Sequence, residues 1–218
     1  MPAHVVTVSA TFGAGGSVIG PAVAERLGVP FVDRAIPVAV AVEIGCTLEE
    51  VLAHDDRAEH GLARLLAGAS RLPNVTLGGM DVYLPDRDLR PEEEFVARTE
   101  QVIRQTADAT GGVFLGRAAA VVLRDRPHAL HVRLDGPADR RLDHALRSAV
   151  PEPGRDPAEW RRQMRRTMEG NDRARAAYVK HFYRVDPASP ALYHMVLDST
   201  RLPEETVADL IVAAARAI

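Results

Sequence analysis

A glycine-rich segment near the start of the chain has the residue types and spacing of a phosphate-binding loop. Residues 10–17 read Ala-Thr-Phe-Gly-Ala-Gly-Gly-Ser. Gly15 and Ser17 match the second glycine and the hydroxyl of the pattern G-x-x-x-x-G-K-[ST]. Glycines let successive backbone N–H groups turn toward one anion, and a following helix adds the positive end of its dipole. The segment therefore predicts a phosphate site made by Gly13, Ala14, Gly15, Gly16 and Ser17, with Ser17 able to reach a bound Mg²⁺.

The same segment lacks the lysine of that pattern. Ala10 stands at the first glycine position and Gly16 at the lysine position. A lysine would place a point charge on the outer phosphates, which the backbone alone cannot supply. Two interpretations stay open: a phosphate loop that takes its charge from elsewhere, and a glycine-rich turn that only packs tightly.

Positive charge is concentrated in a second segment, residues 155–184. It holds nine basic and four acidic residues, in a chain of net charge −3. Phosphoryl transfer requires such charge around the transferred group, so the segment favours an anionic partner. A solvated helix face is the alternative, because runs of charge usually are solvated. A nucleic-acid surface is disfavoured, because the segment has no aromatic side chains interleaved with its basic ones, apart from Trp160, until Tyr178.

The elements that must position these residues alternate between strands and helices. Apolar and β-branched runs predict strands at residues 4–9, 31–33, 112–115, 128–134 and 193–197. Helical spacing predicts helices at 17–27, around 95–103, at 137–149, 157–182 and 207–218, and two or three more within 36–72, before a long polar stretch at 73–90. This alternation predicts one three-layer α/β/α domain with a five-stranded parallel sheet.

The composition excludes several other classes of protein. The 218 residues contain one cysteine, Cys46, so neither an intramolecular disulfide nor a cysteine-based zinc site is available. No apolar run approaches 18 residues and the N-terminus has no signal pattern, so we expect a cytoplasmic protein that does not bind membranes. No serine lies in a G-x-S-x-G context, so acyl transfer has no support.

Four stretches of the chain resemble the cytidylate kinase-like family, relatives of the P-loop nucleoside monophosphate kinases. They are S-A-T-F-G-A-G-G-S with L-G-V-P-F-V-D-R at residues 9–34, V-F-L-G-R at 113–117, N-D-R-A-R-A-A-Y at 171–178 and V-L-D-S-T-R-L at 196–202. A glycine at the lysine position is usual in this family. The resemblance spans most of the chain apart from residues 45–95, where nucleoside monophosphate kinases carry their acceptor-binding region.

The resemblance implies a P-loop fold over residues 1–218, with a helical insert at about 36–95 and a lid at about 155–184. Arg117 would clamp the acceptor phosphate, and Asp33 and Arg34 would border the acceptor pocket. Asp172 and Arg175, one helical turn apart, would complete the catalytic set. Arg173 and Lys180, the only lysine in the chain, would add positive charge from the lid.

Two functions follow as expectations. The first is a phosphotransferase that moves a phosphoryl group from ATP–Mg²⁺ to a nucleoside monophosphate or another small acceptor. The second is a nucleotide-binding regulatory protein with little or no kinase activity. The sequence leaves the acceptor and a homo-oligomeric state open.

Three smaller features are given structural interpretations. His54 and His60 lie among acidic residues, and an exposed acidic helix end accounts for them better than a metal site does. Asp135 and Asp198 follow predicted strands, and we expect them to cap the next helices rather than to assist Mg²⁺.

Overall fold

Five short strands form one parallel sheet in the computed structural model, which describes residues 4–33, 91–149 and 156–218. The strands are β1 (Val5–Ala10), β2 (Phe31–Asp33), β3 (Gly112–Leu115), β4 (Ala129–Asp135) and β5 (Met195–Asp198). Their order across the sheet is β2-β3-β1-β4-β5. All neighbouring pairs are parallel, so their carboxyl ends lie at the same edge. The predicted five-stranded parallel sheet is confirmed.

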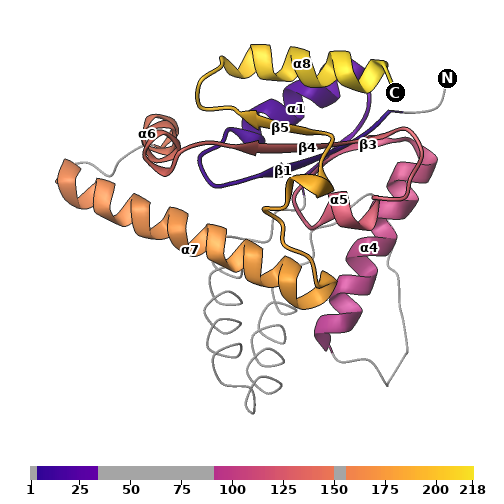
Figure 1. Ribbon diagram of the computed structural model, residues 1–218, viewed down its shortest axis with the longest axis horizontal. Coiled ribbons are helices and arrows are strands. Elements are labelled where there is room, and N and C mark those ends of the chain that lie inside the picture. Colours follow the sequence, from indigo (N-terminus) through magenta and orange to yellow (C-terminus); the bar gives the residue numbers. More distant parts are fainter. Residues whose placement is uncertain (1–3, 34–90, 150–155) are drawn as a thin grey trace, which may run out of the picture.

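Helices α1 (Gly16–Leu27) and α8 (Glu204–Arg216) cover one face of the sheet (Figure 1). Ile19 and Val23 of α1 and Val207 and Ile211 of α8 are completely buried against the sheet, in the largest apolar cluster of the described residues. Their helical spacing forms the apolar stripe that docks each helix. Gly28 ends α1 with a left-handed φ of 67°.

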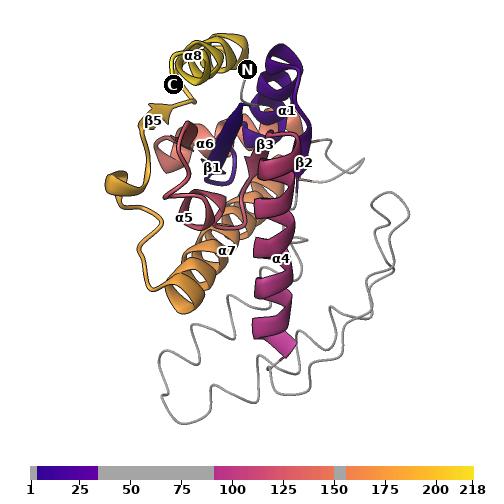
Figure 2. The ribbon, with the colours of Figure 1, turned by 90° about the vertical axis from the view of Figure 1, so that its right-hand side faces the viewer.

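The opposite face carries α4 (Pro91–Ala109) and the short α5 (Ala119–Val122). Ile103 of α4 and Phe114 of β3 are buried together there. Two further helices, α6 (Ala138–Ser148) and α7 (Pro157–Tyr183), pack on each other through Leu142, Met164 and Met168. Figures 1 and 2 show α7 on the same side of the sheet as α4, away from α1 and α8. The predicted three-layer α/β/α architecture is confirmed.

Most of the basic segment forms α7, a single helix of 27 residues. The helices and polar stretch expected between residues 36 and 90, with His54 and His60, lie outside the described residues. No helix in the described part of the chain is long and apolar enough to cross a membrane.

The expectation that Asp135 and Asp198 cap helices is wrong. The N-caps of α6 and α8 are prolines, Pro137 and Pro203, and neither helix has a side-chain cap. Asp198 instead accepts hydrogen bonds from the Thr200 amide and hydroxyl and pairs with Arg140 at 3.1 Å. Asp135 accepts a hydrogen bond from the hydroxyl of Thr11, which follows β1. Both carboxylates organise the loops at the carboxyl edge of the sheet rather than the helices that follow.

A stacked pair of histidines, buried His131 and exposed His194, joins β4 to the start of β5. The rings of His131 and His194 stack with centroids 5.0 Å apart, and His131 Nδ1 lies 2.8 Å from the Thr7 hydroxyl. Burial, and then the neighbouring His194, lower the pKa of His131 to about 4. His131 is therefore neutral in the folded protein, whereas in the unfolded chain it takes up a proton below its ordinary pKa.

Protein stability is expected to fall as the pH is lowered from 6.5 toward 4, because only the unfolded state binds this proton over that range. The full effect is about 3 kcal/mol. Urea denaturation at pH 7, 6 and 5 measures it, and His131→Gln should flatten the slope. His4→Gln is the control and should keep the wild-type slope. Equal slopes for wild type and His131→Gln would contradict the assignment.

Candidate active site

The predicted phosphate loop connects β1 to α1 at the carboxyl edge of the sheet. Gly13 and Gly15 have left-handed φ values of 77° and 75°, a conformation that side-chain-bearing residues rarely adopt. Hydrogen bonds fix the loop at its ends: the Thr11 amide donates to the Leu134 carbonyl and the Ala14 amide to the Thr11 carbonyl, both at 3.1 Å. The glycine pattern thus produces a tight turn with a defined shape.

Four amides of this loop are available to a ligand. Within the residues that the structure describes, the N–H groups of Gly13, Gly15, Gly16 and Ser17 donate to no protein acceptor. Gly15 is the N-cap of α1, so the last two of these amides belong to the first turn of that helix. Ser17 is exposed and its hydroxyl also makes no hydrogen bond in this part of the chain. Unpaired amides at a helix N-terminus provide an anion-binding site.

The loop has little room for a lysine side chain at position 16. A Cβ atom at Gly16 would lie 2.6 Å from the Cβ of Ala10 and 3.1 Å from Leu115 Cδ1. The Ala10 methyl, at the first glycine position, therefore fills the space that the stem of a lysine at position 16 would need. Ala10 and Gly16, the two departures from the lysine-containing pattern, therefore have one steric cause.

Gly16→Lys alone is expected to destabilise the protein by about 1–3 kcal/mol, because the side chain would overpack the end of β1. Adding Ala10→Gly should recover part of this loss, since it removes the methyl group that collides. Thermal or urea unfolding of both single variants and the double variant measures the coupling. Strictly additive effects would show that the two positions do not share this space.

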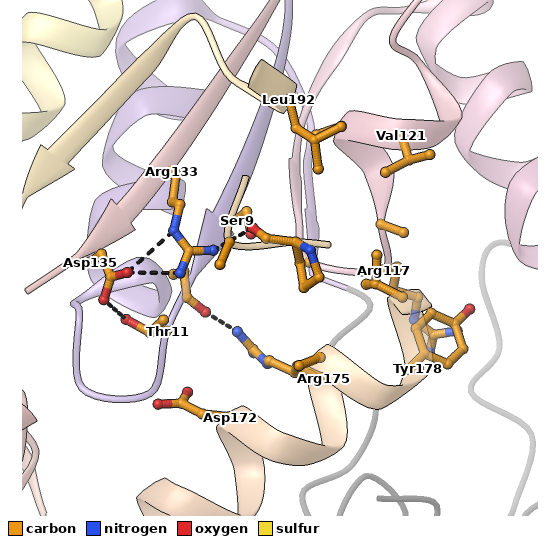
Figure 3. A pocket seen from close by; sticks show the side chains of 18 of the residues that line it. Ser9, Thr11, Arg117, Val121, Arg133, Asp135, Asp172, Arg175, Tyr178 and Leu192 are labelled. Carbon is orange, nitrogen blue, oxygen red and sulfur yellow. Dashed lines mark hydrogen bonds and ion pairs between the residues drawn. The ribbon is translucent and has the colours of Figure 1, made fainter. Parts of the chain in front are cut away.

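A cavity of about 330 Å³ begins at the base of the loop and continues between the sheet edge and α7. Four arginines line it: Arg117, Arg133, Arg141 and Arg175. Figure 3 shows Arg133 entering from β4 and Arg175 from α7, with Leu192 and Val121 on the apolar side. The loop glycines do not line this cavity, so amides and arginines form adjoining parts of one site.

Arg117 follows directly after β3, where the sequence places it. Arg117 and Ala118 both have a left-handed φ of 52°, and the Arg117 guanidinium donates to the Thr99 hydroxyl of α4 at 3.1 Å. This turn directs the side chain into the cavity beside Tyr178 (Figure 3). The position suits a residue that holds an anionic group of a ligand.

Asp172 and Arg175, the other two residues predicted to be catalytic, both contact the loop. The Asp172 carboxylate accepts from the Phe12 amide at 2.9 Å and from Arg141 at 2.6 Å. The Arg175 guanidinium donates to the Ala10 carbonyl. The helical turn between them therefore does bring both to one place, at the base of the phosphate loop.

The remaining predicted residues lie elsewhere. Arg173 and Lys180 are exposed and do not line the cavity, and Lys180 pairs with Asp186 at 3.7 Å. Asp33 ends β2 opposite Leu115 of β3, at the edge of the sheet that carries the site. Arg34 lies outside the described residues. The structure thus gathers Arg117, Asp172 and Arg175 but not the predicted lid cations.

Arg133 and Tyr193 are cavity residues that the sequence analysis did not single out. Arg133 donates to Asp135 at 2.7 Å and to the Pro187 carbonyl at 2.7 Å, and its guanidinium lies 5.9 Å from the Tyr193 ring centroid. The Tyr193 hydroxyl lies 2.8 Å from the same carbonyl. The sequence did contain a pattern that could have identified Arg133. His131, Arg133 and Asp135 alternate along β4, and this alternation places three polar side chains on one face of the sheet.

Asp135 is a poor candidate for a catalytic base. Burial alone would raise the pKa of Asp135, but hydrogen bonds from the Gly136 amide, Arg133 and Thr11 outweigh it and lower the pKa. The carboxylate stays ionised and both oxygens already accept hydrogen bonds. Its effect is to fix Arg133 and the phosphate loop relative to β4.

Two buried polar atoms in the cavity wall lack a partner among the described residues. They are Asn171 Oδ1 and the Tyr178 hydroxyl, on side chains of residues that are each 4% exposed. Burial raises the pKa of Tyr178, so its hydroxyl stays protonated and can donate. Buried polar groups normally have a hydrogen-bond partner. These atoms are therefore suited to a polar group of a ligand.

Comparison with a protein-family model gives a match over residues 5–201, and the description of that model is the cytidylate kinase-like family. The chain belongs to the cytidylate kinase-like family. This confirms the resemblance found in the sequence, and the match also spans residues 45–95, which that resemblance left out. A search of curated proteins found no match.

Solved structures were also compared with this chain. A crystal structure of an uncharacterized protein from Eubacterium ventriosum superposes with a TM-score of 0.64 at 16% identity, covering 100% of both chains. Shikimate kinase from Acinetobacter baumannii gives a TM-score of 0.44 at 14% identity, covering 99% of this chain and 94% of its own. The first of these matches shows that another protein has the fold of this chain, a parallel sheet covered by helices.

Proposed function

We propose that this member of the cytidylate kinase-like family is a nucleotide-dependent phosphotransferase that binds ATP–Mg²⁺ at the loop and a small acceptor in the cavity. One observation carries the proposal: four loop amides that donate to no acceptor among the described residues lie next to a cavity lined by four arginines. Backbone amides that point toward one place can donate several hydrogen bonds to a phosphate. Arginines can neutralise the negative charge of a transferred phosphoryl group. A glycine-rich turn that only packs tightly would require neither these amides nor these arginines.

Each group of residues has a separate task in this scheme. The amides of Gly13, Gly15, Gly16 and Ser17 hold donor phosphates, and Arg117 holds the acceptor phosphate. Arg175 lies at the base of the loop and supplies positive charge between the two. Phosphoryl transfer needs alignment and electrostatic stabilisation more than covalent chemistry, and this arrangement provides both.

Mg²⁺ would enter with the nucleotide. The described residues hold no group of three or more His, Cys, Asp or Glu side chains that could bind a metal ion by itself. The exposed Ser17 hydroxyl makes no hydrogen bond to any residue that the structure describes, and it could serve as a single protein ligand to the ion. When bound, Mg²⁺ would neutralise charge on the donor phosphates.

We propose a nucleoside monophosphate or another small anionic molecule as the acceptor. The cavity suits a ligand with an anionic end near Arg117 and a polar group near Asn171 and Tyr178. A regulatory nucleotide-binding protein is the second candidate. It is favoured by Gly16, because no lysine reaches the outer phosphates.

Isothermal titration with ATP–Mg²⁺, followed by turnover assays with CMP, dCMP, UMP and AMP, tests the proposal. Binding with turnover of one acceptor supports a kinase. Binding without turnover of any acceptor favours the regulatory candidate or a different acceptor. No binding at all would show that the glycine loop is a packing feature and would overturn the proposal.

A further inference from the structure

The peptide unit of Phe12, in the middle of the phosphate loop, is held at both of its polar groups by side chains from two helices. Its N–H donates to Asp172 Oδ1 of α7 at 2.9 Å. Its carbonyl accepts from Arg141 Nη1 of α6 at 2.8 Å. The same Arg141 nitrogen donates to Asp172 Oδ2 at 2.6 Å, which closes the arrangement into a ring.

Further contacts fix Arg141 in this ring. Its Nε donates to the Gly136 carbonyl at 2.9 Å and lies 3.7 Å from Asp135 Oδ1. Its side chain is only 11% exposed. A Cβ atom at Gly13 would overlap the Arg141 carbonyl oxygen, so the loop also packs directly on the backbone of α6. Arg141 therefore contacts the loop through its side chain and through its main chain.

The Phe12 side chain adds an apolar contact to the polar ones. It packs against the cluster of Leu142, Met164 and Met168 that joins α6 to α7. The loop thus inserts between the two helices at the point where they meet. Charged hydrogen bonds to a backbone group in a partly buried place are stronger than neutral ones, so this ring can determine the shape of the loop.

We propose that Arg141 and Asp172 are positioning residues, which hold the Phe12 peptide so that the neighbouring amides face one phosphate. The inference rests on the proposed function for its ligand. It adds Arg141 to the residues of the site and gives Asp172 a positioning role. Because Asp172 lies on α7 and Arg141 on α6, the shape of the loop depends on how α7 docks. Movement of α7 away from the sheet edge would release the loop at the same time.

The structure offers a matched control. Asp139 of α6 pairs with Arg165 of α7 at 2.8 Å, so this ion pair also joins the two helices. It is exposed and does not line the cavity. Asp172→Asn and Asp139→Asn therefore remove the same charge from the same helix pair, and only the first alters the ring around Phe12.

The first measurement is hydrogen exchange of the loop amides by NMR, without nucleotide. Asp172→Ala should speed exchange of the Phe12 amide by at least about tenfold, because its acceptor is removed, and Asp139→Asn should leave the rate unchanged. Equal Phe12 rates in wild type and Asp172→Ala would overturn the inference. This measurement does not depend on whether the protein binds ATP.

The second measurement is the dissociation constant of ATP–Mg²⁺ for folded variants. Asp172→Asn and Arg141→Lys should each weaken binding on the order of tenfold, and the double variant should be little worse than either alone, because both break one ring. Asp139→Asn should bind as wild type does. Faster Phe12 exchange with unchanged affinity would overturn the positioning role. A wild-type protein that binds no ATP–Mg²⁺ would overturn that role together with the proposed function, while the exchange rates still decide whether the ring holds the loop.

Discussion

Gly13→Ala is expected to lower the free energy of unfolding by about 3 kcal/mol and to abolish nucleotide binding. Two costs combine at this position. Gly13 has a φ of 77°, where a residue with a Cβ atom is strained. Its Cβ would also overlap the Arg141 carbonyl oxygen and lie 2.9 Å from the carbonyl carbon. Both atoms belong to the backbone of α6, so no side-chain rotation can relieve the collision.

Gly28→Ala separates these two costs. Gly28 has a φ of 67°, but a Cβ atom there would meet nothing within 4 Å. This variant should lose only about 1–2 kcal/mol and should bind ATP–Mg²⁺ as wild type does. Urea unfolding and isothermal titration of both variants measure the difference. A loss at Gly13 no larger than the loss at Gly28 would mean that the loop is not packed tightly on α6.

Arg117→Ala is expected to reduce turnover by about 10²- to 10³-fold or more, while the protein stays folded. The side chain enters the cavity from the end of β3 and is held by the Thr99 hydroxyl, so its position is set before a ligand binds. Preorganised positive charge is most effective in the transition state, where negative charge is redistributed. Steady-state kinetics with the best acceptor, together with the melting temperature, measure the two parts of the expectation.

Arg126→Ala is the matched control for this variant. Arg126 also contacts α4, through Asp108 and the Ala107 carbonyl, but it does not line the cavity. It should therefore retain wild-type turnover. Unchanged rates in Arg117→Ala would remove the phosphate-clamping role from Arg117. A large loss of melting temperature in Arg117→Ala alone would mean that the residue is mainly structural.

The amino-acid sequence by itself determined the architecture and the location of the loop. Strand and helix periodicity placed the five strands and most of the described helices, because burial of one face imposes that periodicity locally. The short α5 was not predicted, and α4 extends beyond the expected 95–103 at both ends. The turn from β1 to α1 was equally predictable, since Gly13 and Gly15 occupy positions where the backbone needs a left-handed φ. The motifs that carried the family resemblance lie in these same segments.

The roles of individual charged residues were decided only by the tertiary structure. Asp135 and Asp198 follow strands, where a helix cap is a reasonable expectation, yet prolines occupy both N-caps and the carboxylates bind loops instead. Asp172 reads as part of a lid motif, but it binds the Phe12 amide, which is 160 residues away in the chain. Spacing along one helix cannot reveal a partner on another element.

The same reason explains why Arg141 and the pairing of Ala10 with Gly16 could not be predicted. Arg141 is one of many arginines in the sequence, and only the packing of α6 on the loop distinguishes it. The Ala10 methyl excludes a side chain at position 16 because the end of β1 and the start of α1 approach within contact distance. Local sequence determines which elements form, and the close approach of those elements determines which side chains share a site.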